Sequence, residues 1–567
     1  MIRNTILLTL LPLLIGCGNN STSNTSLASD LSLVESYIQN LEDENNISYT
    51  KIMNTRGSYI TSMCYTKTSD ETTNRVSNPC YSCHTKGEIP NYYNDTNLQL
   101  EYNFPAEVMK NPFTNLFKER STQVASMTDN ATLQYVRESN YLNHEGDILP
   151  ALDLPRDWKG YRPDCYFNFD DEGFDQDPKG NYTGWRAFRY YPFLGTFWPT
   201  NGSTDDVIIR LDPIFIQDEN NTFRKEIYAL NLVIVESLIK QKEIPLPSGI
   251  DEKIYGVDLN SNGILDTALN ISPSIESYVG LAKLYLREGK VHLARGLFPE
   301  NTEFLHSVRY IDWDNAKEQI GMSARMKELR YAKKYTWKRY GEIQRAAQSE
   351  LWESLALDST EGQIALFKGN YEEGLRNEIG WVYQGFIENK EGKLRPQTHE
   401  ETINCMGCHS HIGATTDSTF AYARKFEGVN KDQNDYGWNH WGQKGLNGIQ
   451  EPIVEYLNHG KQYEYSFYLL NNHSANEFRN NDEVQSKFFD LNGSIKEDML
   501  NALHEDITVL LFPSKERALE LNKGYKVIVE EQSYIYGRDT HIKPMKNVYE
   551  VIKEGQITGI ENPIVRP

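Results

Sequence analysis

Two short motifs with the same spacing of thiols and imidazoles occur in this 567-residue sequence. Both read C-x-x-C-H, and their residues are Cys80, Cys83, His84, Cys405, Cys408 and His409. Two thiols three positions apart can form thioethers with the vinyl groups of one porphyrin, and the histidine that follows can ligate its iron. A redox dithiol needs no such histidine, and adjacent cysteine and histidine ligands strain a closed tetrahedral zinc site. The motifs therefore predict two covalently attached haem c groups, with His84 and His409 as proximal iron ligands.

The ligand on the opposite face of each iron decides between electron transfer and reactive chemistry at an open position. Met109 lies downstream of the first motif and is a candidate for the first haem. His306 interrupts an apolar stretch and could reach either haem, and His399 is a candidate for the second. The alternatives are a methionine that fills the core at Met109 and a hydrogen-bonded core histidine at His306.

A third pattern offers oxygen ligands. In G-V-D-L-N-S-N-G-I-L-D-T-A, Gly263 stands at a sharp turn; the candidate calcium ligands are Asp258, Asn260, Asn262, the Ile264 carbonyl and Asp266. Leu269 occupies the position of the bidentate glutamate of a sensor EF-hand, so the pattern resembles the shorter calcium loops of extracellular repeats. We expect a structural Ca²⁺ here, and the alternative is an Asn/Gly turn without metal.

The N-terminus reads M-I-R-N-T-I-L-L-T-L-L-P-L-L-I-G-C. Its apolar run is too short for a mature membrane-spanning helix and fits the hydrophobic region of a signal peptide. The ending L-L-I-G-C resembles a bacterial lipobox, which implies lipidation of Cys17 and removal of residues 1–16. Residues 17–30 would form a polar tether. The alternative is an ordinary signal peptide that contains a cysteine.

Two cysteines, Cys64 and Cys165, belong to none of these patterns. In an oxidising compartment, two remaining thiols are most simply explained by a disulfide. The competing interpretation is that one of them ligates a metal or stays free.

The net charge and hydropathy of the chain limit the kinds of partner that it can bind. The formal net charge of -21 disfavours nucleic-acid binding, because an acidic protein repels a phosphate backbone. It favours solubility, or docking of a basic redox partner. A mean hydropathy of -0.61 argues against multiple membrane spans.

The pattern of elements predicts a mainly α fold with a mixed α/β insert, in which cytochrome c-like haem-binding regions flank a larger central domain. We place the first haem region at 31–150, the central domain at 151–394 and the second haem region at 395–567. Helices are expected at 226–241, at 313–357, and on both sides of Phe512-Pro513, where Ser514 is a candidate N-cap. Short strands are expected at 207–211 and 279–286. The basic stretch 330–339 could bind haem propionates or a partner, or form a solvated surface.

With the export signal, the two motifs resemble di-haem c-type cytochromes of the bacterial lipoprotein kind. The resemblance implies a lipid-anchored electron-transfer protein of the cell envelope, periplasm-facing or at the outer membrane, with redox partner proteins. The alternative is a di-haem oxidoreductase or peroxidase, which also carries two such motifs and a calcium but leaves one haem open.

Overall fold

The computed structural model describes residues 60–70, 74–104, 106–355, 367–427, 436–472, 479 and 481–566. These residues belong to one unit of the chain, Ile52–Pro567. The signal peptide, Cys17, the tether and the start of the first haem region lie outside the described residues. The boundaries at 150/151 and 394/395 stay a prediction.

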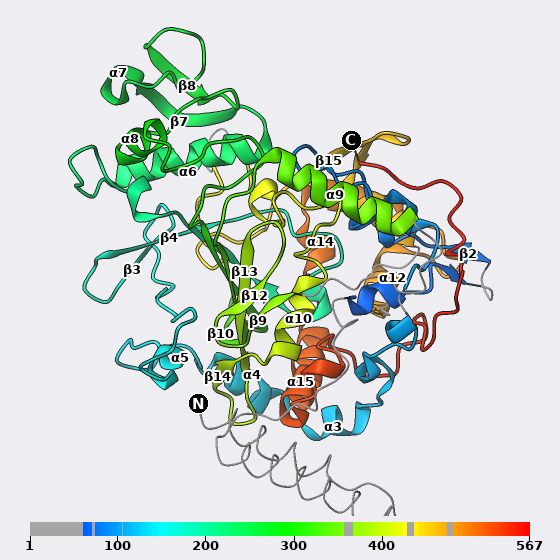
Figure 1. Cartoon of the computed structure of the whole chain (residues 1–567). Helices are drawn as coiled ribbons and strands as arrows, with labels where there is room; N and C mark the ends of the chain where they lie inside the picture. Colours follow the sequence, from blue (N-terminus) through cyan, green and yellow to red (C-terminus); the bar gives the residue numbers. More distant parts are fainter. Residues whose placement is uncertain are drawn as a thin grey trace, which may run out of the picture. The chain divides into compact units, whose positions relative to one another are not determined.

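A ten-stranded antiparallel sheet organises the described residues (Figure 1). Its strand order is β11-β12-β13-β10-β9-β6-β4-β3, with β14 paired to β13 and β5 paired to β9. The strands are β3 Phe174–Gln176, β4 Tyr182–Phe188, β5 Thr204–Asp205, β6 Val207–Arg210, β9 Glu303–Asp314, β10 Gln319–Lys334, β11 Lys368–Asn370, β12 Gly374–Arg376, β13 Trp381–Glu388 and β14 Leu394–Pro396. The prediction of a mainly α fold is therefore wrong, because strands from the central part of the chain form its largest element.

Much of this error comes from the segment 313–357, where the predicted helix is largely strand. Its lack of proline and its helical pattern predict one or two long helices there. The end of β9 and all of β10 instead form a hairpin in which Gln319 pairs with Asp314, and only α9, Tyr340–Leu355, is helical. Both faces of β10 are covered over much of its length, so burial outweighed intrinsic helix propensity.

Other local predictions are confirmed. The expected helix at 226–241 is α6, Lys225–Lys240, and the strand expected at 207–211 is β6. The chain after Pro513 forms α15, Lys515–Glu531, where the Ser514 hydroxyl accepts a hydrogen bond of 3.2 Å from the Arg517 amide. The strand expected at 279–286 is wrong, because that segment forms helix α8, Leu281–Arg287.

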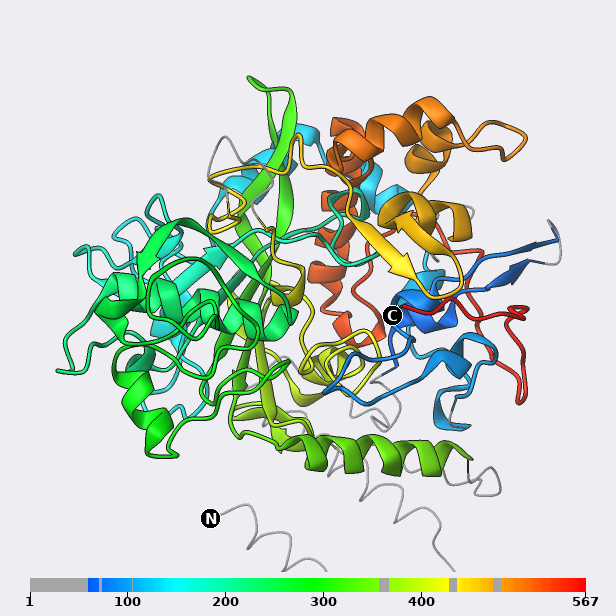
Figure 2. The same ribbon diagram turned by 90° about the horizontal axis from the view of Figure 1, so that it is seen from above.

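The remaining elements are shorter. The helices are α3 Ser121–Ser126, α4 Asp129–Arg137, α5 Leu149–Asp153, α7 Glu252–Tyr255, α10 His399–Met406, α11 Glu464–Asn472, α12 Asp482–Phe488, α13 Glu497–Glu505 and α14 Thr508–Leu511. Three two-stranded sheets pair β1 Ser69–Asp70 with β2 Arg75–Val76, β7 Ile244–Asp251 with β8 Thr267–Ile271, and β15 Ile453–Tyr456 with β16 Gly460–Tyr463. Figure 2 shows the green segments around α6 on one side of the sheet and the orange-to-red C-terminal helices on the other.

Both faces of the large sheet carry apolar cores, because neighbouring side chains on a strand point to opposite faces. Leu305 of β9 packs in a core with Trp185 and Phe386, whereas Phe304 packs in a core with residues of α6. His306 lies two positions after Phe304 and therefore shares its face of the sheet. This alternation fixes which side chains of β9 can reach the site described below.

We predict that Ser514→Ala lowers the free energy of unfolding by about 1.5 kcal/mol, because it removes the cap of α15. The Ser514 hydroxyl also donates to the Glu483 carboxylate, so the loss should fall in the upper half of the usual range for caps. The midpoint of urea unfolding measures the effect. Ser514→Thr keeps a capping hydroxyl and is the control; an equal loss in both variants would contradict the capping role.

Candidate functional site

The two C-x-x-C-H motifs meet in the fold, although 320 residues separate His84 from Cys405. The Cys83 carbonyl accepts a hydrogen bond of 3.1 Å from the amide of Ala414, five residues after His409. Cys83 and Cys408 also line one cavity. The fold therefore joins two distant segments into one site.

Asn91 and Asp95 hold these segments together. The Asn91 side-chain amide, on a residue that is only 6% exposed, donates to the carbonyls of Ile412 (2.8 Å) and Thr415 (3.0 Å). The Asp95 carboxylate accepts hydrogen bonds from His84 Nδ1 at 2.8 Å and from the Gly413 amide at 3.3 Å. One carboxylate thus orients the imidazole of the first motif and fixes the backbone that follows the second.

Both motifs adopt the same local turn. The first begins in a 3₁₀ turn, Cys80–Ser82, and the His84 amide donates to the Cys80 carbonyl at 2.8 Å. The second begins at the end of α10, and the His409 amide donates to the Cys405 carbonyl at 3.0 Å. This i to i+4 bond places each histidine one helical turn after the first cysteine of its motif, on the same side of the backbone.

Each motif histidine uses Nδ1 for a protein contact, which leaves Nε2 for a ligand. His409 Nδ1 lies 2.9 Å from the Ser418 carbonyl, and burial lowers the His409 pKa to about 4. Burial also acts to lower the pKa of His84, but the charge and hydrogen bond of Asp95 raise it to about 10. A second contact of this kind fixes the ring orientation of metal-binding histidines and raises their basicity.

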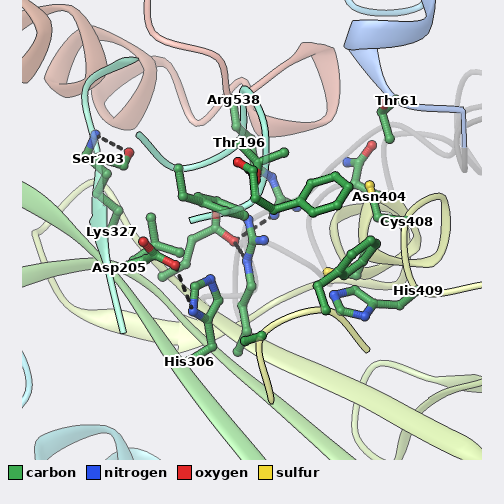
Figure 3. Close-up of a pocket in the computed structure, with 18 of the residues that line it drawn as sticks. Thr61, Thr196, Ser203, Asp205, His306, Lys327, Asn404, Cys408, His409 and Arg538 are labelled. Atoms are coloured by element: carbon green, nitrogen blue, oxygen red, sulfur yellow. Dashed lines mark hydrogen bonds and ion pairs between the residues drawn. The ribbon is translucent and has the colours of Figure 1, made fainter. Parts of the chain in front are cut away.

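A cavity of about 330 Å³ lies beside the second motif, lined by Cys405, Cys408 and His409 (Figure 3). Cys408 and His409 stand at one side and His306 with Asp205 at the other. The His306 Nδ1 atom lies 2.5 Å from the Asp206 carbonyl, so Nε2 of this ring is also free for a ligand. Burial, followed by the charge of Arg330, lowers the pKa of His306 to about 4, which keeps the imidazole neutral.

Of the three candidate distal ligands, only His306 lines this cavity. Met109 lies elsewhere, where its carbonyl accepts a hydrogen bond of 2.8 Å from the Ile552 amide. His399 is the first residue of α10 and does not line the cavity either.

Four cationic side chains also line the cavity, and the sequence analysis singled out a segment containing only one of them, Arg330; the others are Lys327, Arg479 and Arg538. Burial lowers the pKa of Lys327 to about 7. Burial acts to raise the pKa of Glu328, but Arg330 and Arg538 lower it to about 2. Arg330 belongs to the basic stretch 330–339, whose composition was the one available signal, although the segment begins as strand β10 and not as a helix.

These residues fit a haem c. Two thiols, an imidazole with Nε2 available, aromatic side chains and four cationic side chains line one space, and cations of this kind would bind the propionates of a haem. Among the described residues, no group of three or more His, Cys, Asp or Glu side chains is arranged to hold a metal ion. A haem iron needs no such group, because the porphyrin supplies four of its ligands.

The disulfide expected between Cys64 and Cys165 is not formed, and both thiols are free. Cys165 is buried in the core with Trp185, where its carbonyl accepts a hydrogen bond of 2.7 Å from the Tyr141 hydroxyl. Cys64 belongs to a 3₁₀ turn, Ser62–Tyr65, and its sulfur lies 3.5 Å from the Thr61 hydroxyl. Counting unassigned cysteines could not foresee this, because the count contains no geometry.

The predicted calcium loop joins α7 to β8 and turns on itself. Both Asp258 carboxylate oxygens accept backbone hydrogen bonds, from Asn262 at 3.1 Å and from Gly263 at 2.7 Å. Gly263 has a φ of +87°, as the sharp turn requires. The buried Glu252 carboxylate accepts a hydrogen bond of 3.0 Å from the Asp266 amide and so fixes the end of the loop.

Comparison with known proteins identifies lipoproteins. A family profile described as "-like lipoprotein" matches residues 50–504 and 437–556. A protein of Aquifex aeolicus (strain VF5) named "Uncharacterized lipoprotein" is 30% identical over 536 residues, which cover 85% of each chain. No solved structure matches the chain significantly. Within the described ranges, no helix has the length and apolar character needed to cross a membrane.

A buried ion pair supports the loop after the second motif. Lys334 of β10 and Asp417 are both fully buried and in direct contact, and Asp417 also accepts a hydrogen bond of 2.9 Å from the Phe298 amide. Asp417 is followed by Ser418, whose carbonyl orients His409. The pair therefore links the central sheet to the loop that orients His409.

We predict that Asp417→Ala destabilises the protein by about 3–5 kcal/mol, because it leaves the Lys334 ammonium buried without a partner. The double variant Lys334→Met/Asp417→Leu should recover much of this loss. Lys317→Ala breaks the exposed Lys317–Asp314 pair but keeps the backbone hydrogen bonds that the Asp314 carboxylate accepts, and it is the control, with an expected loss of about 0–1 kcal/mol. Urea unfolding measures all three, and equal losses in both single variants would contradict the assignment.

Proposed function

Because the chain belongs to a family of lipoproteins, we propose that it is an exported, lipid-anchored di-haem c-type cytochrome that transfers electrons at the cell envelope. The observation that carries the proposal is the meeting of the two motifs. Cys83 and Cys408 line one cavity, so groups bonded to them would be neighbours, as a short electron-transfer path requires. The side chains of Asn91 and Asp95 bridge the two segments and would keep such groups at a fixed separation.

When bound, the two haems would supply one-electron chemistry by cycling their iron between the ferric and ferrous states. The chain's own residues would hold and tune them. The four motif cysteines would anchor the macrocycles, and His84 and His409 would present Nε2 in fixed orientations. Arg330 and Arg538 would neutralise propionates, and the aromatic lining would exclude water.

His306 is proposed as the distal ligand opposite His409. It lines the same cavity, its ring is held by the Asp206 carbonyl, and its pKa reflects the nearby charge of His409. A haem with two imidazole ligands is six-coordinate and low-spin, which suits electron transfer and leaves no open position.

A second candidate function, a di-haem oxidoreductase or peroxidase, is favoured by Asp205. This carboxylate lines the cavity beside His306 and accepts a hydrogen bond from the Tyr190 hydroxyl. Burial raises the pKa of Asp205 to about 7, which suits a group that exchanges protons with a substrate near neutral pH. In this alternative His306 stays off the iron, and the open position binds substrate.

The finer parts of the proposal concern location, partners and calcium. The protein would face the periplasm or lie at the outer membrane, and its acidic surface would dock a basic redox protein. A structural Ca²⁺ would bind the loop from Asp258 to Asp266, where the Gly263 turn resembles calcium loops.

Haem content tests the main claim. We predict two haems per chain in the reduced pyridine adduct of the protein purified from a host with a periplasmic haem-attachment system. Cys80→Ala/Cys83→Ala and Cys405→Ala/Cys408→Ala should each retain one haem. Cys165→Ala is the control and should retain two. Fewer than two haems in the unmodified protein would refute the proposal.

The spin state separates the two candidate functions. We predict that the ferric protein is low-spin at both haems, and that His306→Ala converts one haem to a high-spin form that binds added cyanide. His399→Ala and Met109→Leu are the controls and should leave the spectrum unchanged. A high-spin haem in the unmodified protein that shifts on addition of peroxide would instead support the oxidoreductase.

Calcium is tested separately. We predict that Ca²⁺ raises the melting temperature of the protein and that the rise is lost in Asp258→Ala/Asp266→Ala. Asp170→Ala, in an acidic turn outside the loop, is the control. Melting temperatures that are equal in Ca²⁺ and in a chelator would contradict the site.

A further inference from the structure

Lys327 of β10 differs from the other cationic side chains of the cavity in its partners. The other three pair with carboxylates at distances of 2.8–3.0 Å: Arg330, Arg479 and Arg538. Lys327 is only 1% exposed, yet it forms no ion pair with any described residue. Its ammonium donates to the Gly202 carbonyl at 2.6 Å and to the Ser203 hydroxyl at 3.1 Å. An ammonium has three protons, so one of them remains for a ligand.

The two carboxylates whose charge acts on Lys327, Glu328 and Glu388, are already bound by other groups. Glu388 pairs with Arg325 at 2.8 Å and accepts a hydrogen bond of 2.6 Å from the Tyr310 hydroxyl. Glu328 holds two arginines of the cavity. Because a buried charge is costly without a counter-charge, the ammonium lacks an anion that the described part of the chain does not supply.

Three further residues that line the cavity surround this ammonium: Ser203, Tyr525 and Thr540. The face of the Tyr525 ring lies 4.1 Å from Lys327 Nζ, and the buried Tyr525 hydroxyl has no hydrogen-bond partner among the described residues. Thr540 lies beside Gly202, where a Cβ atom would be 3.4 Å from the Thr540 hydroxyl oxygen. A buried hydroxyl without a partner indicates a ligand, and two hydroxyls and an ammonium are all able to donate to it.

We propose that this end of the cavity binds a small monovalent oxygen anion, of the class of formate or nitrate. Its oxygens would accept hydrogen bonds from Lys327 Nζ and from the hydroxyls of Tyr525 and Thr540. Figure 3 shows Lys327 and Ser203 at the side of the cavity away from Cys408 and His409, so the anion would not compete for the second motif. The inference goes beyond the proposed function and requires no haem. In the oxidoreductase alternative, the same site would hold an anionic substrate.

The existing contacts of Lys327 position the ammonium but do not neutralise it. The Gly202 carbonyl and the Ser203 hydroxyl carry no net charge. The rings of Tyr525 and Tyr310, at 4.1 Å and 5.0 Å, attract a cation through their π faces, but they leave its charge and its third proton in place. Burial lowers the pKa of Lys327 to about 7, as expected for a lysine without a counter-ion. A bound anion would supply that counter-ion.

The first test is a calorimetric titration of the full-length holoprotein at constant ionic strength. We expect formate and nitrate to bind at a single site per chain and to compete with each other. Lys327→Met should lose this binding, because methionine fills the space without a charge. Lys523→Met is the matched control: Lys523 pairs with Asp129 at 2.6 Å and does not line the cavity, so its loss should leave binding unchanged. No binding to the unmodified protein, or equal binding in both variants, would overturn the inference.

Acetylation of the unmodified protein gives a second measurement, which decides the question if Lys327→Met fails to fold. Acetic anhydride reacts with neutral amines and not with ammonium groups, and a bound anion stabilises the ammonium. Saturating formate should slow the acetylation of Lys327 by about tenfold, measured by mass spectrometry of peptides, and leave that of Lys523 unchanged. Equal rates with and without formate would contradict the site. Protection of Lys327 that is complete before formate is added would show that a haem propionate holds the ammonium, which also overturns the inference.

The pyridine adduct of the same preparation counts the haems separately. Fewer than two haems would refute the proposed function, whereas formate binding that depends on Lys327 would still support the anion site. Two haems without formate binding would have the opposite meaning.

Discussion

The candidate site depends on one close approach of two backbones, between Gly413 and Thr85. A Cβ atom on residue 413 would lie 1.9 Å from the Thr85 carbonyl oxygen, so any other residue would force the two segments apart. The polar bridges of Asn91 and Asp95 can form only at this separation. Since buried polar groups are costly unless paired, these bridges also make the contact specific. The two motifs are thus parts of one structural unit.

Elements with a strong local signal could be predicted from the sequence. Helix α6 has its apolar residues at helical spacing, and α15 begins after a proline with a serine cap, so both were found. Strand β10 could not be found in this way, because its residues favour helices and one of its two partners, β13, comes from a distant part of the chain. Its conformation is decided by pairing and burial on both faces, and neither can be seen in a local pattern. The mainly α expectation failed for this reason.

The site could be predicted in part. The two C-x-x-C-H motifs and the lipobox are short patterns of residue type and spacing, and membership of a lipoprotein family confirms the lipoprotein part of the prediction. His306 was a candidate because it interrupts an apolar run, and the sheet carries it to the cavity. Asp95 and Asn91 gave no such signal. Their roles come from contacts made across the fold, and a short polar residue has no sequence pattern that predicts them.

The two motif histidines differ in the charge of the group that contacts Nδ1. His84 shares its Nδ1 proton with a carboxylate, whereas His409 bonds a neutral carbonyl. An anionic partner makes an imidazole a stronger donor and stabilises the higher charge of a ferric iron. The cavity beside the second motif does contain Arg330 and Arg538, but both pair with the Glu328 carboxylate, at 3.0 Å and 2.8 Å. Their charges are therefore largely balanced, and the carboxylate beside His84 is the main difference between the two histidines. If each motif held a haem, this carboxylate would lower the reduction potential of the first relative to the second.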